Sequence, residues 1–461
     1  MTVWISVLCG MMLIGCRRDD RPAADPELPN VVFVSLDTLR QDRVGAYGYA
    51  RPITPALDAF ADKGTIFLNS YAQSSSTLPT HASIFTSRWP QQHQSFGQER
   101  ALHEDELTLA EVLRDAGYDT WAGVSSRRFI LPLNLDQGFE RYARYWWFEK
   151  SARSVRLNKD FLRIARQSKD RPVFAFLHYF DAHAPYDPPE PYPETFTTVR
   201  EDIRPDDTAD FIARYRYARL SDEKLTYLKD LYDGGIVYLD HHLEELFTET
   251  RFSNGRPTLW IITADHGEAF SEHRYLGHSR KVYEELLHVP LIMVWEGVIP
   301  AGQRSPALAQ SVDLFPTILE LLSLEAPEGL MGRSLAGPLR GEIQPSDERI
   351  PGALDVIPIL DLPDVWGMIA TLPGEGRLKI IQHRDEALKL YLLDHDPAER
   401  RNMVRRKPEL QERMVHIADS VGLPALKPFT VRSEGAREVS AREIDMLREL
   451  GYIDEADDIE R

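Results

Sequence analysis

Short, unbroken apolar runs alternate with segments of helical periodicity along most of the chain. The runs at residues 31–35, 65–71 and 173–177 are rich in β-branched and aromatic residues, a composition typical of strands buried on both faces of a parallel sheet. Amphipathic segments at 54–64 and 107–118 lie between such runs, and each ends at or near a glycine, a common helix stop. Because strand and helix alternate, the pattern predicts an α/β fold with a large, mostly parallel sheet flanked by helices.

Polar side chains that can bind metal ions or act as acids and bases follow three of the predicted strands. Asp37 lies two residues beyond the first run, the pair Asp181 and His183 follows the third, and the pair Asp265 and His266 follows a further predicted strand. Taken singly, each residue can be explained as a loop cap or a solvated side chain. Ligands of open α/β sheets bind outside the carboxyl ends of the strands. The three pairs of strand and polar residue together therefore favour a metal site at that edge.

A run of small hydroxyl residues at 74–77 precedes a predicted helix. Pro79 suits the first helical position, because its φ is fixed and its missing N–H is not needed there. We therefore expect Thr77 at or just before a helix N-terminus, where unpaired N–H groups and the helix dipole favour an anion. A hydroxyl held there is placed to attack, or to be esterified by, a phosphate-like group. For this stretch alone, the alternative is an ordinary Ser/Thr-rich loop with a threonine cap.

The residue types at the predicted sheet edge indicate a divalent metal ion. Asp37, Asp265 and His266 offer oxygen and nitrogen ligands suited to Mn²⁺, Zn²⁺, Mg²⁺ or Ca²⁺. A cation bound by them would lower the pKa of the Thr77 hydroxyl and neutralise oxygens of a tetrahedral anionic ester.

Two histidines and a lysine are candidates for contacts with that ester. His183 and His278 are expected to hydrogen-bond its oxygens or to protonate the leaving group, although His278 by itself is equally well explained as a surface histidine. Lys281 would add positive charge. A second metal could draw on Asp181, His183 and His273, but we expect one metal.

Composition and charge narrow the class of partner. The chain has 461 residues and a formal net charge of −18, which argues against nucleic acid, because phosphate backbones require a basic surface. A small anionic substrate in a metal-bearing pocket is not excluded. The only cysteines are Cys9 and Cys16. The folded body therefore has no disulfide framework, no thiolate metal site and no catalytic cysteine.

The N-terminal segment predicts export. Residues 1–16 form an apolar run that fits a signal peptide and is too short to span a bilayer comfortably, which takes about 20 residues. The ending LIGC resembles the lipobox of bacterial lipoproteins, in which the cysteine, here Cys16, carries the lipid. A plain secretory signal is the alternative. Residues 17–29 are charged and Pro-rich, as expected of a flexible tether. We expect a protein of the bacterial cell envelope or periplasm, held at a membrane by a lipid on Cys16.

The order of these blocks resembles that of the sulfatase family within the alkaline-phosphatase superfamily. TLPTHASIFTSRWP, residues 77–90, is similar position by position to the family signature C-x-P-S-R-x-x-L-x-T-G-R. The other blocks that carry the resemblance are VVFVSLDTLRQDRVGAYGY (31–49), FLHYFDAHAPYDPP (176–189), ITADHGEAF (262–270), GHSRKVYEELLHVPLI (277–292), MGRSL (331–335), LKLYLLDHDPAERRNM (388–403) and SAREIDMLRELGYID (440–454).

The resemblance implies an alkaline-phosphatase-like catalytic domain at residues 30–340. It further implies a small C-terminal α+β subdomain with an antiparallel sheet at 341–430, followed by a tail with a helix at 431–461. By the same resemblance the metal ligands are Asp37, Thr77, Asp265 and His266, Thr77 is the nucleophile, and His183 and His278 contact the substrate anion, His278 in place of a family lysine.

Three departures from the family pattern bear on the chemistry. Thr77 stands where the family has the Cys or Ser that becomes formylglycine, and threonine cannot be converted. The signature arginine is His81, so the positive group that contacts the substrate beside the nucleophile becomes weaker and titratable. The paired Asp-Asp of calcium sulfatases is Asp37-Thr38. The loss of that carboxylate favours Mn²⁺ or Zn²⁺ over Ca²⁺. We expect one Mn²⁺ or Zn²⁺ ion, with Ca²⁺ and Mg²⁺ as the alternatives.

The first departure favours phosphoester or phosphodiester cleavage, or phosphoryl transfer. A formylglycine hydrate can expel sulfate by collapsing to the aldehyde, whereas a threonine ester must be opened at its central atom, as happens readily in metal-assisted phosphoryl transfer. The alternatives are a sulfuric ester hydrolase without formylglycine, since the rest of the chain is most sulfatase-like, and an inactive anion-binding relative. The retained Asp37, Asp265, His266 and hydroxyl nucleophile speak against the last. No pattern in the sequence identifies the substrate.

Overall fold

A large central sheet dominates the structure, which is a computed structural model of the chain. The structure describes residues 25–96, 100–129, 133–146, 150–200, 202–342, 355–362, 365–383 and 386–423. The strands of the central sheet are β1 (Asn30–Leu36), β2 (Thr65–Tyr71), β3 (Asp119–Val124), β4 (Arg141–Arg144), β5 (Val173–Tyr179), β6 (Thr258–Thr263), β9 (Leu291–Val294) and β10 (Gln303–Gln310).

The eight strands follow the order β10-β2-β9-β6-β1-β5-β3-β4. Neighbouring strands are parallel except at β9, which runs antiparallel to both β2 and β6. Strand β1 is buried along its whole length, as expected of a β-branched run covered on both faces. Its Phe33 pairs in register with Phe176 of β5 and with Ile261 of β6. The predicted α/β fold with a large, mostly parallel sheet is confirmed.

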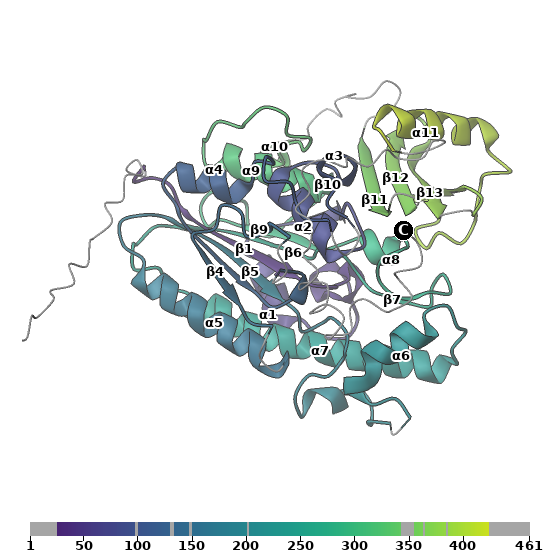
Figure 1. Ribbon diagram of the computed structural model, residues 1–461, viewed down its shortest axis with the longest axis horizontal. Coiled ribbons are helices and arrows are strands. Elements are labelled where there is room, and N and C mark those ends of the chain that lie inside the picture. The colour runs from purple at the N-terminus through teal and green to yellow at the C-terminus, as the bar shows by residue number, and fades with distance from the viewer. Residues whose placement is uncertain are drawn as a thin grey trace, which may run out of the picture.

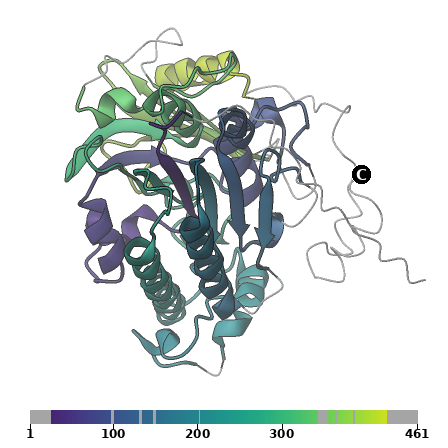
Figure 2. The same ribbon diagram turned by 90° about the vertical axis from the view of Figure 1, so that its left-hand side faces the viewer.

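Helices cover both faces of the central sheet, and each face has its own apolar cluster. Alternate residues of β1 enter the two clusters, Val32 on one face and Phe33 on the other, because successive side chains of a strand point to opposite sides. Figures 1 and 2 show the two longest helices lying along one face. The helices on that face are α1 (Pro55–Ala61), α5 (Lys150–Gln167) and α7 (Asp222–Glu249), and those on the other are α2 (Thr77–Thr86), α4 (Leu109–Asp115) and α9 (Leu314–Leu321).

A second, antiparallel sheet lies beside the carboxyl ends of the central strands, in green and yellow in Figure 1. Its strands pack on one side against α11 and on the other against α8, which belongs to the large domain. Four strands in the order β11-β12-β13-β14 form it. The elements of this region are β11 (Val356–Leu362), β12 (Val365–Leu372), β13 (Gly376–His383), β14 (Lys389–Leu392), α11 (Pro408–Ser420) and α8 (Glu284–Leu287).

Smaller elements connect these layers. They are the hairpin β7 (Ala269–Phe270) and β8 (Leu276–Gly277), the helices α3 (Pro90–His93), α6 (Thr208–Tyr215) and α10 (Ala336–Leu339), and the 3-10 turns η1 (Gln41–Arg43), η2 (Gly45–Tyr47), η3 (Arg127–Phe129), η4 (Tyr192–Glu194), η5 (Pro205–Asp207) and η6 (Ser311–Asp313).

A buried charge cluster joins the second sheet to the large domain. Lys379 of β13 is fully buried, and its ammonium lies 2.9 Å from Glu284 of α8 and 3.0 Å from Glu399. Buried charges are tolerated only when they are paired and hydrogen-bonded. The two carboxylates meet that requirement for the lysine, but they share one positive charge between them.

The predictions about the two ends of the chain concern residues outside the described part. These are the leader at 1–16 with Cys16, residues 17–24 of the tether, and the tail at 431–461. None of the described helices combines the length and the apolar character needed to cross a bilayer.

Candidate active site

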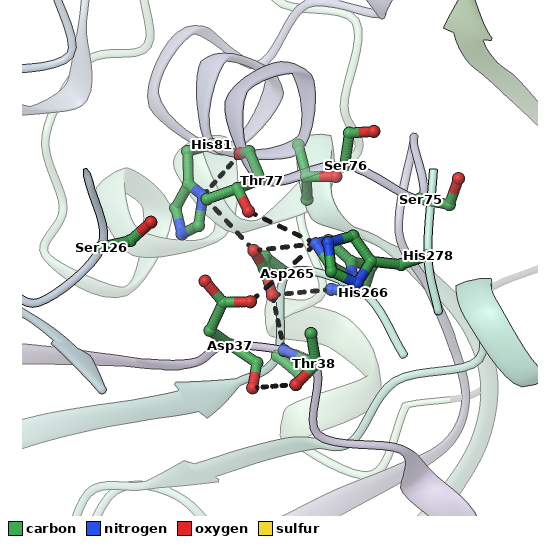
Figure 3. Close-up of polar contacts among 12 residues, drawn as sticks. Asp37, Thr38, Ser75, Ser76, Thr77, His81, Ser126, Asp265, His266 and His278 are labelled. Atoms are coloured by element: carbon green, nitrogen blue, oxygen red, sulfur yellow. Dashed lines mark hydrogen bonds and ion pairs between the residues drawn. The ribbon is translucent and has the colours of Figure 1, made fainter. Parts of the chain in front are cut away.

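The ends of two neighbouring strands bring carboxylates and an imidazole together. Asp37 directly follows β1, and Asp265 and His266 follow β6, which pairs with β1 in parallel register. One ligand atom of each of these three residues lies within 4.8 Å of the other two. Figure 3 shows the two carboxylates facing the His266 ring from below Thr77. All three side chains are buried, with at most 1% exposure.

Backbone amides hold Asp265 in place. Its Oδ1 accepts hydrogen bonds from the N–H groups of His266 at 2.9 Å and Thr38 at 3.2 Å, while its buried Oδ2 accepts none from a described residue. Burial by itself raises the pKa of Asp265, but the neighbouring His266 imidazole and the hydrogen bond from the Thr38 N–H help to outweigh it and lower the pKa. The carboxylate is therefore charged and has one oxygen left for a ligand.

Thr38 does not replace the second carboxylate of the calcium sulfatases. It adopts the left-handed conformation, with φ at 61°, and its hydroxyl donates to the carbonyl oxygen of Asp37 at 2.7 Å. Its contribution to the site is the hydrogen bond from its backbone N–H to the Asp265 carboxylate.

The tautomer of His266 leaves a lone pair directed at the cluster. Its Nδ1 donates to the Gly267 carbonyl at 3.0 Å, so that in the neutral ring Nε2 is the acceptor. That Nε2 lies 3.4 Å from Asp265 and 4.0 Å from Asp37. Burial opposes a charge on His266, but these two carboxylates prevail and raise its pKa. A cation bound at the same place would replace the proton.

Thr77 is the first residue of helix α2, and Ser76 is its N-cap. The Thr77 Oγ1 lies 3.4 Å from the His266 Nε2 (Figure 3). The expectation that Pro79 takes the first helical position was wrong by two residues. The N–H groups of the first helical turn have no intrahelical partner. Because proline has no N–H, it fits the third position of that turn as well as the first. The threonine is consequently at the N-terminus itself, where the dipole favours an anion.

His81 does not supply a positive group beside the nucleophile, and its predicted contact with the substrate is corrected. Its ring is fully buried beneath Thr77, with Nδ1 2.7 Å from the Thr77 carbonyl oxygen and Nε2 2.9 Å from the Ser35 hydroxyl. Burial lowers the pKa of His81 to about 3, so the ring is neutral near pH 7. Residue 81 lies one helical turn after Thr77 on the same face of α2, where its ring contacts Ser35 of β1 and is not among the residues that line the cavity.

A second group of possible metal ligands shares Asp265 with the first. It consists of His81, His178 and Asp265, again within 4.8 Å of one another. Because both nitrogens of His81 are already engaged, this group fits a metal ion less well than Asp37, Asp265 and His266. His178, a polar residue in the otherwise apolar run of β5, was not among the residues predicted from the sequence. The feature that could have revealed His178 is the length of the strand, because β5 continues to Tyr179. His178 therefore pairs in register with Ser35 of β1.

A cavity of about 210 Å³ opens beside Thr77. His183 enters it stacked on Phe180, with 4.1 Å between ring centroids. His278 lies 4.8 Å from His183 and 4.6 Å from His266, measured between ring centroids. The lining residues are Ser76, Thr77, Leu78, Ser126, Arg128, Phe180, His183, His278, Ser279, Arg280, Asp361 and Leu362.

Glu268 orients His278. Its Oε1 lies 3.2 Å from the His278 Nδ1, and the carboxyl group is completely buried. Burial, with the nearby His266 and Arg216, lowers the pKa of His278 well below its ordinary value. Burial likewise raises the pKa of Glu268. A neutral imidazole with its Nδ1 turned to Glu268 leaves Nε2 for other contacts.

Three residues named from the sequence lie elsewhere. The Lys281 ammonium pairs with Glu386 at 2.8 Å and does not line the cavity, so its predicted contact with the substrate is corrected. His273 lies 2.9 Å from Glu285, and Asp181 binds the Ser154 hydroxyl at 2.5 Å, so neither belongs to the described metal-ligand groups. Arg128 and Arg280, which were not among the residues predicted from the sequence, also line the cavity.

The family model described as Sulfatase matches residues 29–324. The chain belongs to the sulfatase family. It is accordingly an ester hydrolase, and this family generally depends on a divalent metal ion. Asp37, Asp265 and His266 fit such an ion, because they offer two carboxylate oxygens and an imidazole nitrogen within 4.8 Å of one another, and one buried oxygen of Asp265 has no hydrogen bond in the described structure.

Known sulfatases and a related hydrolase resemble this sulfatase-family chain over most of its length. An arylsulfatase of Clostridium perfringens is 23% identical over 380 residues, 67% of this chain and 77% of the relative. An N-acetylglucosamine-6-O-sulfatase of Bacteroides thetaiotaomicron is 23% identical over 421 residues, 73% and 75% of the two chains. The solved phosphonate monoester hydrolase of Agrobacterium radiobacter superposes with a TM-score of 0.68 at 21% identity, covering 86% of this chain and 96% of that one.

Proposed function

We propose that the protein hydrolyses phosphoric monoesters or diesters, with Thr77 as the nucleophile. The observation that carries the proposal is the place of the Thr77 Oγ1. It lies at the N-terminus of α2, 3.4 Å from the His266 Nε2, on the wall of the cavity. A hydroxyl in that position is adjacent both to the ligand set and to the space for an anion.

The chemistry of a threonine ester supports phosphorus over sulfur. In the proposed reaction the Thr77 oxygen forms a bond to phosphorus as its proton passes to solvent water, and the bond to the leaving oxygen breaks as that oxygen takes a proton from His183. Water then attacks phosphorus, the bond to Thr77 breaks, and the hydroxyl is restored. Phosphoryl groups are transferred at the central atom in this way, and threonine has no aldehyde form through which it could release sulfate instead.

The residues around Thr77 have separate roles in this proposal. When bound by Asp37, Asp265 and His266, a divalent cation supplies Lewis-acid stabilisation of the anionic oxygens. The contact with Glu268 fixes the Nδ1 side of the His278 ring. The Nε2 of His278 is then left to hydrogen-bond an ester oxygen. His183, on the same wall, is placed to give the leaving oxygen its proton.

A sulfuric ester is the second candidate substrate. The family name and the relatives compared above, among them an N-acetylglucosamine-6-O-sulfatase, support it. The likeness to a phosphonate monoester hydrolase supports a phosphoric ester as the substrate. The two candidate substrates differ in the central atom, phosphorus or sulfur, that Thr77 would bind and then release.

An ester panel tests the proposal. The purified chain, loaded with Mn²⁺ or Zn²⁺, is assayed with 4-nitrophenyl phosphate, bis(4-nitrophenyl) phosphate and 4-nitrophenyl sulfate. We expect turnover of a phosphorus ester and the mass of one phosphoryl group on the peptide that contains Thr77 after acid quenching. Thr77→Ala should lose turnover by a factor of 10³ or more, on the order of what loss of a nucleophile costs, and should keep bound metal.

Thr86→Ala is the matched control, since Thr86 is a buried threonine of the same helix whose hydroxyl donates to the Ala82 carbonyl. Its activity should equal that of the wild type. Full activity in Thr77→Ala rejects the nucleophile. A clear preference for the sulfate ester rejects the choice of phosphorus.

A further inference from the structure

Three segments that are far apart in the sequence meet beside Thr77. They are the loop before α2, the loop after β8 and strand β11 of the second sheet. The Leu360 N–H donates to the Gln73 carbonyl at 3.0 Å, and the Ser279 N–H donates to the Ser75 carbonyl at 2.9 Å. The second sheet therefore contacts the loop that leads into the nucleophile.

Asp361 is the centre of this junction. Its side chain is buried, with 1% exposure, and its Oδ2 accepts the Arg280 N–H. Its Oδ1 lies 2.8 Å from the Ser74 hydroxyl, 3.2 Å from that of Ser75 and 2.6 Å from that of Ser76. A buried carboxylate is costly unless several donors satisfy it. The serine run noted in the sequence supplies those donors.

A β-bulge directs Asp361 toward the large domain. The pairing of β11 with β12 shifts register between Leu360 and Leu362, so that Asp361 is the additional residue on its strand. Bulges of this kind turn a side chain out of the regular alternation and are common beside active sites. Because β11 is the edge strand of its sheet, the turned side chain reaches the other domain.

Ser76 gives up an ordinary structural role for this contact. It is the N-cap of α2, but its side chain makes no capping hydrogen bond, although serine at an N-cap usually bonds a first-turn N–H. Its hydroxyl instead lies 2.6 Å from Asp361 and 2.7 Å from the Ser279 hydroxyl. The residue directly before the nucleophile is thus fixed from outside the helix.

The loop that follows His278 is fixed at the same point. Ser279 and Arg280 are consecutive residues in the left-handed region, with φ at 65° and 61°, which is unfavourable for side chains other than glycine. Two hydrogen bonds hold that conformation: the Ser279 N–H donates to the Ser75 carbonyl, and the Arg280 N–H donates to the Asp361 carboxylate. The backbone that carries His278 is therefore tied to the backbone that carries Thr77.

We infer that Asp361 is a positioning residue for the reaction: through Ser76 and Arg280 it sets the distance between the Thr77 hydroxyl and the His278 ring. The inference rests on the proposed function in assigning the nucleophile to Thr77. Asp361 lines the cavity, and both of its oxygens already accept hydrogen bonds from the protein, Oδ1 from the serine hydroxyls and Oδ2 from the Arg280 N–H. A misplacement of about 1 Å at the reacting groups can cost on the order of 10²-fold in rate.

Asp361→Asn tests the inference, because it keeps the shape but turns an amide NH₂ toward groups that also donate. We expect kcat to fall about 10- to 100-fold, with KM within roughly a factor of two to three and with unchanged metal content. The matched control is Asp240→Asn. Asp240 is a buried aspartate of α7 that accepts the N–H groups of Ala56 and Leu57, and its variant should keep the wild-type kcat.

A double-variant cycle with Ser76→Ala separates positioning from mere stability. If Asp361 acts through Ser76, then Ser76→Ala lowers kcat in the wild type and adds little in the Asp361→Asn background. Ser76→Ala also serves alone if Asp361→Asn does not fold, since it removes one hydroxyl from a half-buried side chain. A wild-type kcat in either single variant, with only the melting temperature lowered, overturns the inference. A raised KM at unchanged kcat overturns it too, because it would mean direct substrate contact.

The activity of Thr77→Ala distinguishes this failure from failure of the proposed function. If Thr77→Ala is active, Thr77 is not the nucleophile, and both the proposed function and the positioning role of Asp361 are rejected. If Thr77→Ala is inactive while the Asp361 and Ser76 variants have the wild-type kcat, only the positioning role falls.

Discussion

The Nε2 of His178 lies 3.2 Å from the Oδ2 of Asp37. Both side chains are buried, and neither nitrogen of His178 makes a hydrogen bond to a described residue. Burial lowers the pKa of His178 to about 4, so the ring is neutral near pH 7. A neutral imidazole in contact with a metal-ligand carboxylate restricts the orientations which that carboxylate can adopt.

His178→Gln should therefore weaken metal binding. Loss of a group that orients a ligand typically costs 10- to 100-fold in metal affinity or activity, and we expect an increase of that size in the dissociation constant for Mn²⁺ or Zn²⁺ from calorimetric titration. His242→Gln is the control, because the His242 ring is also buried and neither of its nitrogens makes a hydrogen bond to a described residue, but it lies on α7. An unchanged affinity in His178→Gln would remove the ring from the account of the metal site.

Metal removal should destabilise the wild-type protein. Asp37 and Asp265 are buried carboxylates, and a cation that binds only the folded state stabilises it by about 4 kcal/mol at a concentration 1,000 times its Kd. We expect a chelator to lower the melting temperature by several degrees and added Mn²⁺ or Zn²⁺ to restore it. In Asp265→Asn the chelator should change almost nothing. An equal chelator effect in both proteins would show that the stabilising ion binds elsewhere.

The contact between Glu268 and His278 predicts graded losses of activity. His278→Ala should reduce kcat/KM by roughly 10²- to 10³-fold, in the range for a group that transfers a proton or stabilises charge. Glu268→Gln should cost less, about tenfold, because glutamine can still accept the Nδ1–H. His273→Ala is the control: His273 has a similar glutamate partner, Glu285, but does not line the cavity. A loss in His273→Ala that equals that of His278→Ala would contradict the assignment.

The charge cluster between the two sheets predicts a pH-dependent stability. Burial raises the pKa of Glu399 from 4.5 to about 7; Lys379 opposes this rise, and the neighbouring Glu284 adds to it. The folded state thus holds this proton more tightly than the unfolded state. The stabilisation is fully present below pH 4.5 and is lost as the pH rises to about 7. Lys379 has a raised pKa and stays charged across this window.

Glu399→Gln should accordingly flatten the fall in melting temperature between pH 5 and pH 8. Glutamine carries no charge at either pH, so its burial costs the same at both. Glu386→Gln is the control, because the lysines beside the half-exposed Glu386 overcome the effect of its burial and lower its pKa to about 2. Its slope across the same range should match the wild type. A variant Glu399→Gln with the wild-type slope would refute the titration of this group.

The sequence by itself determined the sheet and the edge at which the chemistry gathers. Buried β-branched runs such as that of β1 can be read locally, and parallel strands necessarily present their carboxyl ends together. Asp37, Asp265 and His266 were therefore found from their distance to a strand end. Thr77 was placed at a helix start for the same local reason, and the two-residue error over Pro79 concerned only the helix boundary.

Only the tertiary structure decided what each polar group contacts. Lys281 turned to Glu386, 105 positions away, and His81 was buried as a neutral ring, although both occupy positions that suggested a contact with the anion. His178 and Asp361 gained their importance from partners on other strands and in another domain. A side chain's charge state and direction depend on desolvation and on neighbours brought close by the fold, and neither quantity is present in the local pattern.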